Sequence, residues 1–180
     1  MLGAALLSSG DYTQRQAPDR QICQGNAPRV CVWPEHAKWA DTAAEVAHRL
    51  DAALGDVYRF PPVVYEEGLP EAPSGGGPIV RIDRLPMTPA SLVQGLGLGV
   101  IPEAPFDCWR ESQRLERRTL IKAWLEMRAA GQLASVATDG AKLSVLLSRS
   151  PSEQRAWVLE NLPAATDCSA PVPPSSLEAS

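Results

Sequence analysis

The sequence predicts an α+β fold, in which a small sheet with a βαβ-like arrangement forms the N-terminal half and helices form the C-terminal half. The three strand-like stretches, residues 29–33, 62–66 and 79–82, all lie in the first half of the chain. Apolar residues at helical spacing dominate from residue 88 onward. A long amphipathic pattern at residues 35–54 lies between the first two strand-like stretches. A chain of 180 residues has the size of one domain, and we place that domain at residues 23–168.

Residues 1–22 are expected to be a linker or a membrane-helix stub. Met1–Gly10 is apolar and uncharged but lacks the basic n-region of a signal peptide. It is compatible with a disordered start, with the stub of a membrane helix, and with a short helix that packs on the body. No apolar run in the chain approaches the roughly 20 residues that a bilayer span requires.

The first predicted unit is a strand, a tight turn and an amphipathic helix. Residues 29–33 alternate as a strand does, and Pro34 and Glu35 suit the first turn of a helix that Gly55 ends. Residues 62–66 form the second strand candidate. Residues 79–82 form the third, which we expect to add by a hairpin-like return.

The second half reads as a series of helices. The predicted helices cover residues 88–98, 107–130, 141–147 and 150–163. Ser150, Pro151 and Glu153 have the form of a capping box with proline at the first helical position. Residues 169–180 are rich in proline and serine and are expected to be a disordered tail.

Charge argues against a nucleic-acid partner. The net charge is −4, whereas binding to phosphate backbones needs a basic surface. Basic residues do gather between positions 110 and 128, but glutamates are mixed with them. We therefore interpret that stretch as the solvated face of a helix.

The four cysteines are Cys23, Cys31, Cys108 and Cys168. Their spacing contains no CxxC pair, which argues against a structural zinc site and a thioredoxin-like motif. Two disulfides are the simplest interpretation, with Cys23–Cys31 joining the first strand to the preceding loop and Cys108–Cys168 tying the helical half together. Four cysteines allow three pairings, and the alternative is four buried thiols in a cytosolic protein.

No catalytic motif, metal site or cofactor site is evident in the sequence. The two histidines, His36 and His48, lie on one predicted helix about 18 Å apart, so they cannot share a metal. The acids Glu66, Glu67 and Glu71 read as solvated residues of a Pro- and Gly-containing loop. Candidates for contact with a ligand or partner are Trp33, Glu35 and His36.

One block of sequence resembles a known family. The stretch Cys23-QGNAPR-VCVWPEH, ending at His36, is similar to the extracytoplasmic domain of actinobacterial ABC-transporter permease-like membrane proteins. The segment Ser150–Cys168, a Pro-capped helix followed by a cysteine, is also similar to the end of such domains. The resemblance implies a location on an oxidising face of a membrane, an accessory role, and membrane anchoring outside this chain. It transfers no catalytic residue.

These observations leave three functional hypotheses. The first is a non-enzymatic extracytoplasmic accessory domain of a transporter-like protein, which binds a protein partner. The second is a soluble cytosolic adaptor or partner subunit from a biosynthetic operon, with free thiols. The third is an enzyme whose unrecognised site combines acids and arginines, such as Glu35, His36 and Arg81.

Overall fold

The computed structural model describes residues 21–55, 58–72, 79–82, 88–101, 112–131, 140–174 and 177. The three readings of Met1–Gly10 therefore concern residues outside the described ones. The described residues form a small sheet and a set of helices, which confirms the α+β fold class.

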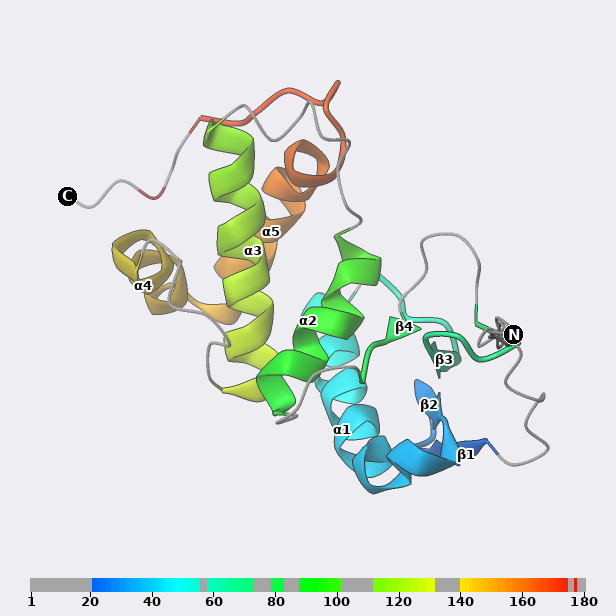
Figure 1. Ribbon diagram of the computed structural model, residues 1–180. Helices are drawn as coiled ribbons and strands as arrows, with labels where there is room; N and C mark the ends of the chain where they lie inside the picture. The colour runs from blue at the N-terminus through cyan, green and yellow to red at the C-terminus, as the bar shows by residue number, and fades with distance from the viewer. Residues whose placement is uncertain are drawn as a thin grey trace, which may run out of the picture.

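The sheet has the strand order β1-β2-β3-β4 (Figure 1). Its strands are β1 (Ile22–Gln24), β2 (Arg29–Val32), β3 (Val63–Glu66) and β4 (Ile79–Val80). β1 is antiparallel to β2, whereas β2, β3 and β4 are mutually parallel. The short 3-10 turn η1 (Pro34–His36) and helix α1 (Ala37–Leu54) connect β2 to β3, so the predicted βαβ-like unit is confirmed.

Two features of the sheet differ from the sequence prediction. β1 lies in a segment that the sequence suggested was a loop, because three residues are too few to show an alternating pattern. β4 was expected to return antiparallel to β3, but it pairs in parallel, with Tyr65 opposite Ile79. A loop of about a dozen residues is long enough for a parallel connection, and residues 67–78 provide it.

Small side chains allow α1 to lie close to the sheet. Its buried face consists of Ala40, Ala43, Ala44, Val46, Ala47, Leu50 and Leu54. Proline opens η1 ahead of the helix, and Gly55 follows it with a φ of 53°. That backbone region is costly for residues with a Cβ, so the glycine suits the end of the helix.

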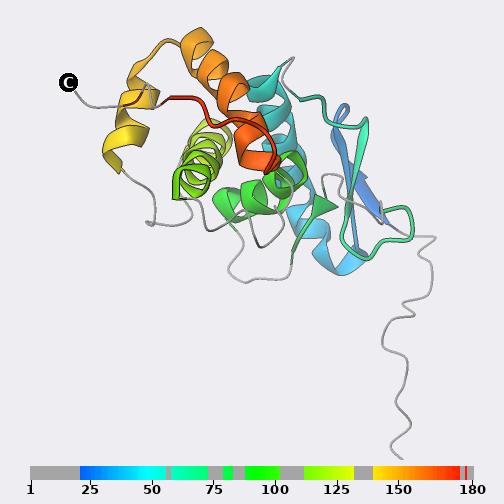
Figure 2. The same ribbon diagram turned by 90° about the horizontal axis from the view of Figure 1, so that it is seen from above.

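The remaining helices are α2 (Pro89–Val100), α3 (Ser112–Ala130), α4 (Gly140–Ser148) and α5 (Pro151–Thr166). α1 and α2 lie between the sheet and the other helices (Figure 2). α3 is central in the helical half, since it packs against α1, α2, α4 and α5. The predicted capping box at Ser150 and Glu153 is present. α5 runs through Pro163 and ends at Thr166, three residues later than predicted.

Buried arginines contradict the interpretation of α3 as a helix with a solvated basic face. Arg117 and Arg118 are buried, and Arg118 donates hydrogen bonds to the carbonyls of Ala165 and Ile101. The carbonyls at the end of a helix have no partner within that helix, so they are natural acceptors for such side chains. α3 therefore uses its basic residues to hold neighbouring backbone.

The segment after α5 also differs from the predicted disordered tail. Its described residues, 167–174, lie against α3, and Arg114 donates to the carbonyls of Asp167 and Ala170. Leu177 has no exposed surface and belongs to the main hydrophobic core.

The amide of Gln154 joins α3, α4 and α5. Gln154 is 2% exposed, and its Oε1 accepts hydrogen bonds from Trp124 Nε1 at 2.8 Å and from Arg128 Nη2 at 2.6 Å. Its Nε2 donates to the carbonyls of Leu147 at 3.1 Å and Arg149 at 2.7 Å. Every hydrogen-bonding atom of this buried amide thus has a partner, as buried polar groups require.

We predict that Gln154→Ala lowers the free energy of unfolding by about 3 kcal/mol. The substitution removes the hydrogen-bond partner of the Trp124 and Arg128 donors and of the carbonyls of Leu147 and Arg149. Urea unfolding with the disulfides intact measures the change. Gln113→Ala, at an exposed position of α3, is the matched control and should stay within about 0.5 kcal/mol of wild type. A loss below about 1 kcal/mol for Gln154→Ala would contradict the role of this amide.

Candidate functional site

The carboxyl ends of the parallel strands meet at one edge of the sheet, which we call the carboxyl edge. Trp33 follows β2, Glu66 ends β3, and Arg81 follows β4. The strand register brings these positions side by side. In open α/β sheets this edge is where ligands bind, so the polar residues there form the candidate site.

Glu66 is the centre of the carboxyl edge. It lies on the same buried face of β3 as Val64 and is itself only 4% exposed. Its Oε2 accepts a hydrogen bond from the backbone N–H of Trp33 at 2.8 Å. Its Oε1 lies 2.5 Å from Nδ1 of His36. One buried carboxylate therefore ties the end of β3 to the turn between β2 and α1.

Burial raises the pKa of the Glu66 carboxyl above its usual value. The hydrogen bonds from Trp33 and His36 oppose the shift, because they favour the ionised carboxylate, but burial is the larger cause.

Trp33 anchors the outer face of the sheet. Its ring is buried with Cys31 and Leu69 in a small second hydrophobic cluster, separate from the main core. Its Nε1 donates to the carbonyl of Glu67 at 3.3 Å. The side chain of Glu67 in turn lies 3.2 Å from Nε of Arg81.

The structure brings some candidate residues together and separates others. His36 pairs with Glu66, and Arg81 pairs with Glu67, whereas Glu35 is exposed on the turn. The interpretation of Glu66 as a solvated loop acid is wrong. Its place two residues after Val64, on the buried face of a strand, is the sequence signal that could have revealed it.

The pair can orient an imidazole. Glu66 holds Nδ1 of His36, and no described residue bonds to Nε2. The side chain of His36 is 27% exposed, so Nε2 is accessible for contact with a partner. Among the described residues, no group of three His, Cys, Asp or Glu side chains is placed to hold a metal ion.

A shallow open cavity of about 360 Å³ lies at the opposite end of β2. The turn at residues 25–28 and the α1 residues Asp41, Ala44, Glu45 and His48 line it. Gly25 has a φ of 83°, and a Cβ there would lie 3.0 Å from the Cβ of Ala44. Glycine is therefore required for the turn to lie this close to α1.

The cysteines form disulfides where the structure describes them. Cys23 and Cys31 face each other across β1 and β2 and are bonded, with their Cα atoms 4.0 Å apart. Cys168 is disulfide-bonded as well, and the described residues include no free cysteine. The predicted pairing of Cys168 with Cys108 involves a residue outside the described ones.

Comparison with known proteins identifies one family. Residues 30–168 match the family model DUF7224, which is a domain of unknown function. The search of curated proteins found no match to the chain, and neither did the search of solved structures.

We predict that the stability difference between wild type and Glu66→Gln depends on pH. Since the folded state raises the pKa of Glu66, its stabilising contribution is complete below about pH 4, near the pKa of an unfolded glutamate. That contribution is lost as pH rises through the higher pKa of the folded state, whereas glutamine does not titrate. The free energy of unfolding of wild type should therefore fall relative to that of Glu66→Gln as pH rises from about 4 through the raised pKa of the folded state.

Urea unfolding at several pH values provides the comparison, and Glu71→Gln, an exposed acid beyond the same strand, is the control. If the free energy of unfolding of wild type instead rises relative to that of Glu66→Gln as pH rises, the hydrogen bonds from Trp33 and His36 lower the pKa of Glu66, and the prediction is wrong.

Proposed function

The chain belongs to the DUF7224 family, and we propose that it is a non-enzymatic extracytoplasmic accessory domain that binds a protein partner for a membrane transporter-like protein. The transporter association rests on the resemblance of residues 23–36 to permease-like proteins. None of the described helices has both the length and the hydrophobicity of a bilayer span, and the proposal places membrane anchoring outside this chain.

The disulfide between Cys23 and Cys31 is the observation that carries the proposal. Cytosolic thiols are kept reduced by glutathione and thioredoxin, whereas disulfides persist in extracytoplasmic compartments. Cys23 is only partly buried, so the bond is open to reductants if the protein is in the cytosol. The disulfide state of Cys168 supports the same compartment.

The geometry of the carboxyl edge supports partner binding over catalysis. Both carboxylate oxygens of Glu66 are engaged, one with His36 and one with the backbone N–H of Trp33. These bonds fix the turn that carries Glu35. The turn is therefore rigid, and it presents exposed Glu35 and partly exposed His36 to solvent. A preorganised polar edge of this kind lowers the entropic cost of binding a partner.

Thiol trapping in cells tests the compartment. Cells that produce the protein are quenched in acid and denatured, and free thiols are labelled with a maleimide of high mass. We expect no labelled cysteine without reductant and labelling of all four after reduction. Cys23→Ser is the control, because it frees Cys31 and must add a labelled thiol. Four labelled thiols without reductant would refute the extracytoplasmic location and favour the cytosolic adaptor.

Site-specific cross-linking tests the partner contact. A photoreactive amino acid is placed at Glu35 or, as a matched exposed control, at Gln113 on α3. Irradiation of intact cells should give a protein adduct from position 35 and none from position 113. Equal adducts from both positions, or none from position 35, would place the partner surface elsewhere.

A further inference from the structure

The chain after α5 crosses α3 as an extended segment that we call the C-terminal strap, residues 169–174 and 177. It runs over the first half of α3 (Figures 1 and 2). Its described residues form neither helix nor strand. The family match ends at residue 168, so the strap lies just beyond the matched domain.

Guanidinium groups of α3 hold the backbone of this region. Arg114 donates to the carbonyls of Ala164 at 3.3 Å, Asp167 at 3.0 Å and Ala170 at 2.8 Å. Arg117 Nη2 donates to the carbonyl of Pro173 at 3.3 Å. The two arginines therefore bind backbone carbonyls from the end of α5 into the strap.

The composition of the strap suits this mode of contact. Pro171, Pro173 and Pro174 have no backbone N–H, so this stretch offers mostly carbonyl acceptors. Arginine offers only donors, which makes the two surfaces complementary. Proline also favours the extended conformation before binding, which reduces the entropy lost when the segment docks.

Leu177 anchors the far end of the strap. It has no exposed surface and is part of the main core cluster. Extended proline-rich segments are a recurring kind of peptide ligand, and here one buried apolar residue follows such a segment.

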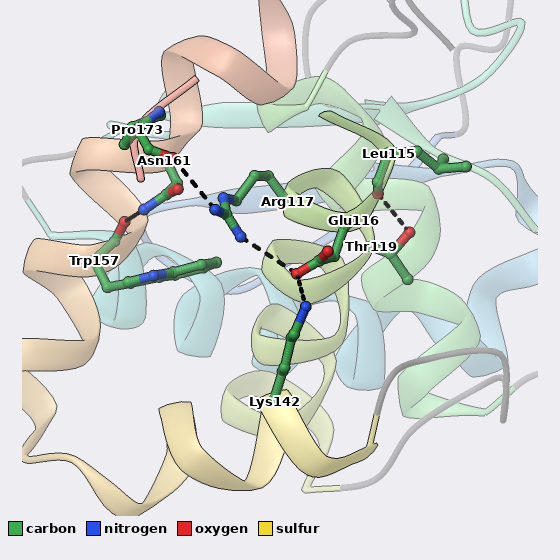
Figure 3. Close-up of polar contacts among 8 residues, drawn as sticks. All are labelled: Leu115, Glu116, Arg117, Thr119, Lys142, Trp157, Asn161 and Pro173. Carbon is green, nitrogen blue, oxygen red and sulfur yellow. Dashed lines mark hydrogen bonds and ion pairs between the residues drawn. The ribbon is translucent and has the colours of Figure 1, made fainter. Parts of the chain in front are cut away.

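The surface under the strap keeps polar atoms that the strap does not satisfy. Arg117 is 3% exposed, and Figure 3 shows one arm of its guanidinium directed toward Pro173 and the other toward Glu116, whose Oε1 also accepts from Lys142. Arg117 Nε and Asn161 Oδ1 are among the buried side-chain atoms of the described residues that have no hydrogen-bond partner. A donor and an acceptor therefore remain available in the same region of the site.

We propose that the surface of α3 around Arg114 and Arg117, with the place in the core that Leu177 occupies, is a binding site for an extended proline-rich peptide, and that the chain's own C-terminal strap occupies it as an intramolecular ligand. Recognition is through backbone carbonyls and one leucine, so the site accepts segments that keep the prolines and the leucine. The inference does not depend on the compartment or on the partner proposed for the carboxyl edge.

A cleavable strap tests the proposal. The full chain, with a specific protease site inserted after Ser169, is folded intact, cleaved and freed of the strap by gel filtration. A fluorescent peptide with the sequence of residues 170–180 should then bind the cleaved protein and leave the uncleaved protein unbound, as measured by anisotropy. Peptides with Leu177→Ala, or with the three prolines changed to alanine, should bind at least about tenfold more weakly.

Variants of the protein test whether peptide binding depends on Arg114 itself or on the loss of any arginine at the surface. Arg114→Ala in the cleaved protein should weaken peptide binding by about fivefold or more, and Arg114→Lys should not restore it, since lysine lacks the forked donors. Arg155→Ala removes a similar bond to the Ala52 carbonyl away from the strap and should leave binding unchanged. Unfolding on cleavage, measured by circular dichroism, would overturn the proposal, as would equal binding of the Leu177→Ala peptide.

Discussion

The helical half depends on how α3 satisfies its buried polar side chains. Arg118 binds a carbonyl near the end of α5, and Trp124 and Arg128 bind the amide of Gln154 near its beginning. α3 therefore holds both ends of α5 by hydrogen bonds with defined directions. Apolar contacts between these helices supply most of the stabilisation, but they are not directional. The polar contacts fix which packing is adopted, since any other would leave buried groups without partners.

In the sheet, too, a buried polar side chain with bonded partners links two elements. Glu66 is an ionisable residue on the buried face of β3, and it is tolerated because Trp33 and His36 both bond to it. These two bonds tie the end of β3 to the turn between β2 and α1. The alanine face of α1 then fits closely on the sheet. The bonds to one buried side chain thus link the strand–turn–helix unit to the neighbouring strand, and the candidate site lies at that link.

Local patterns were enough to predict the fold class, the β2–α1–β3 unit and the main helices, because periodicity, capping residues and glycine stops act over a few residues. They were not enough for contacts between distant segments. The partner of Glu66 lies 30 residues away, and Arg118 meets Ala165 at a separation of 47 residues. A buried arginine and a solvated one look alike in sequence when glutamates surround both. The parallel pairing of β4 depended on a long connection that no short motif specifies.

The limits of the family match separate a common domain from the two ends attached to it. Residues 30–168 include α1, the parallel strands apart from Arg29, and the helices through α5. β1 and the C-terminal strap fall outside that range, and each is held by a specific link. Cys23 joins β1 to Cys31, while arginines of α3 hold the strap. Both links attach an end that has little core of its own, since β1 is three residues long and the strap buries chiefly Leu177. Such ends are the parts of a fold that can be exchanged or released with the least disturbance to the core. The disulfide makes one attachment depend on the redox state of the compartment, while the arginine contacts leave the other reversible.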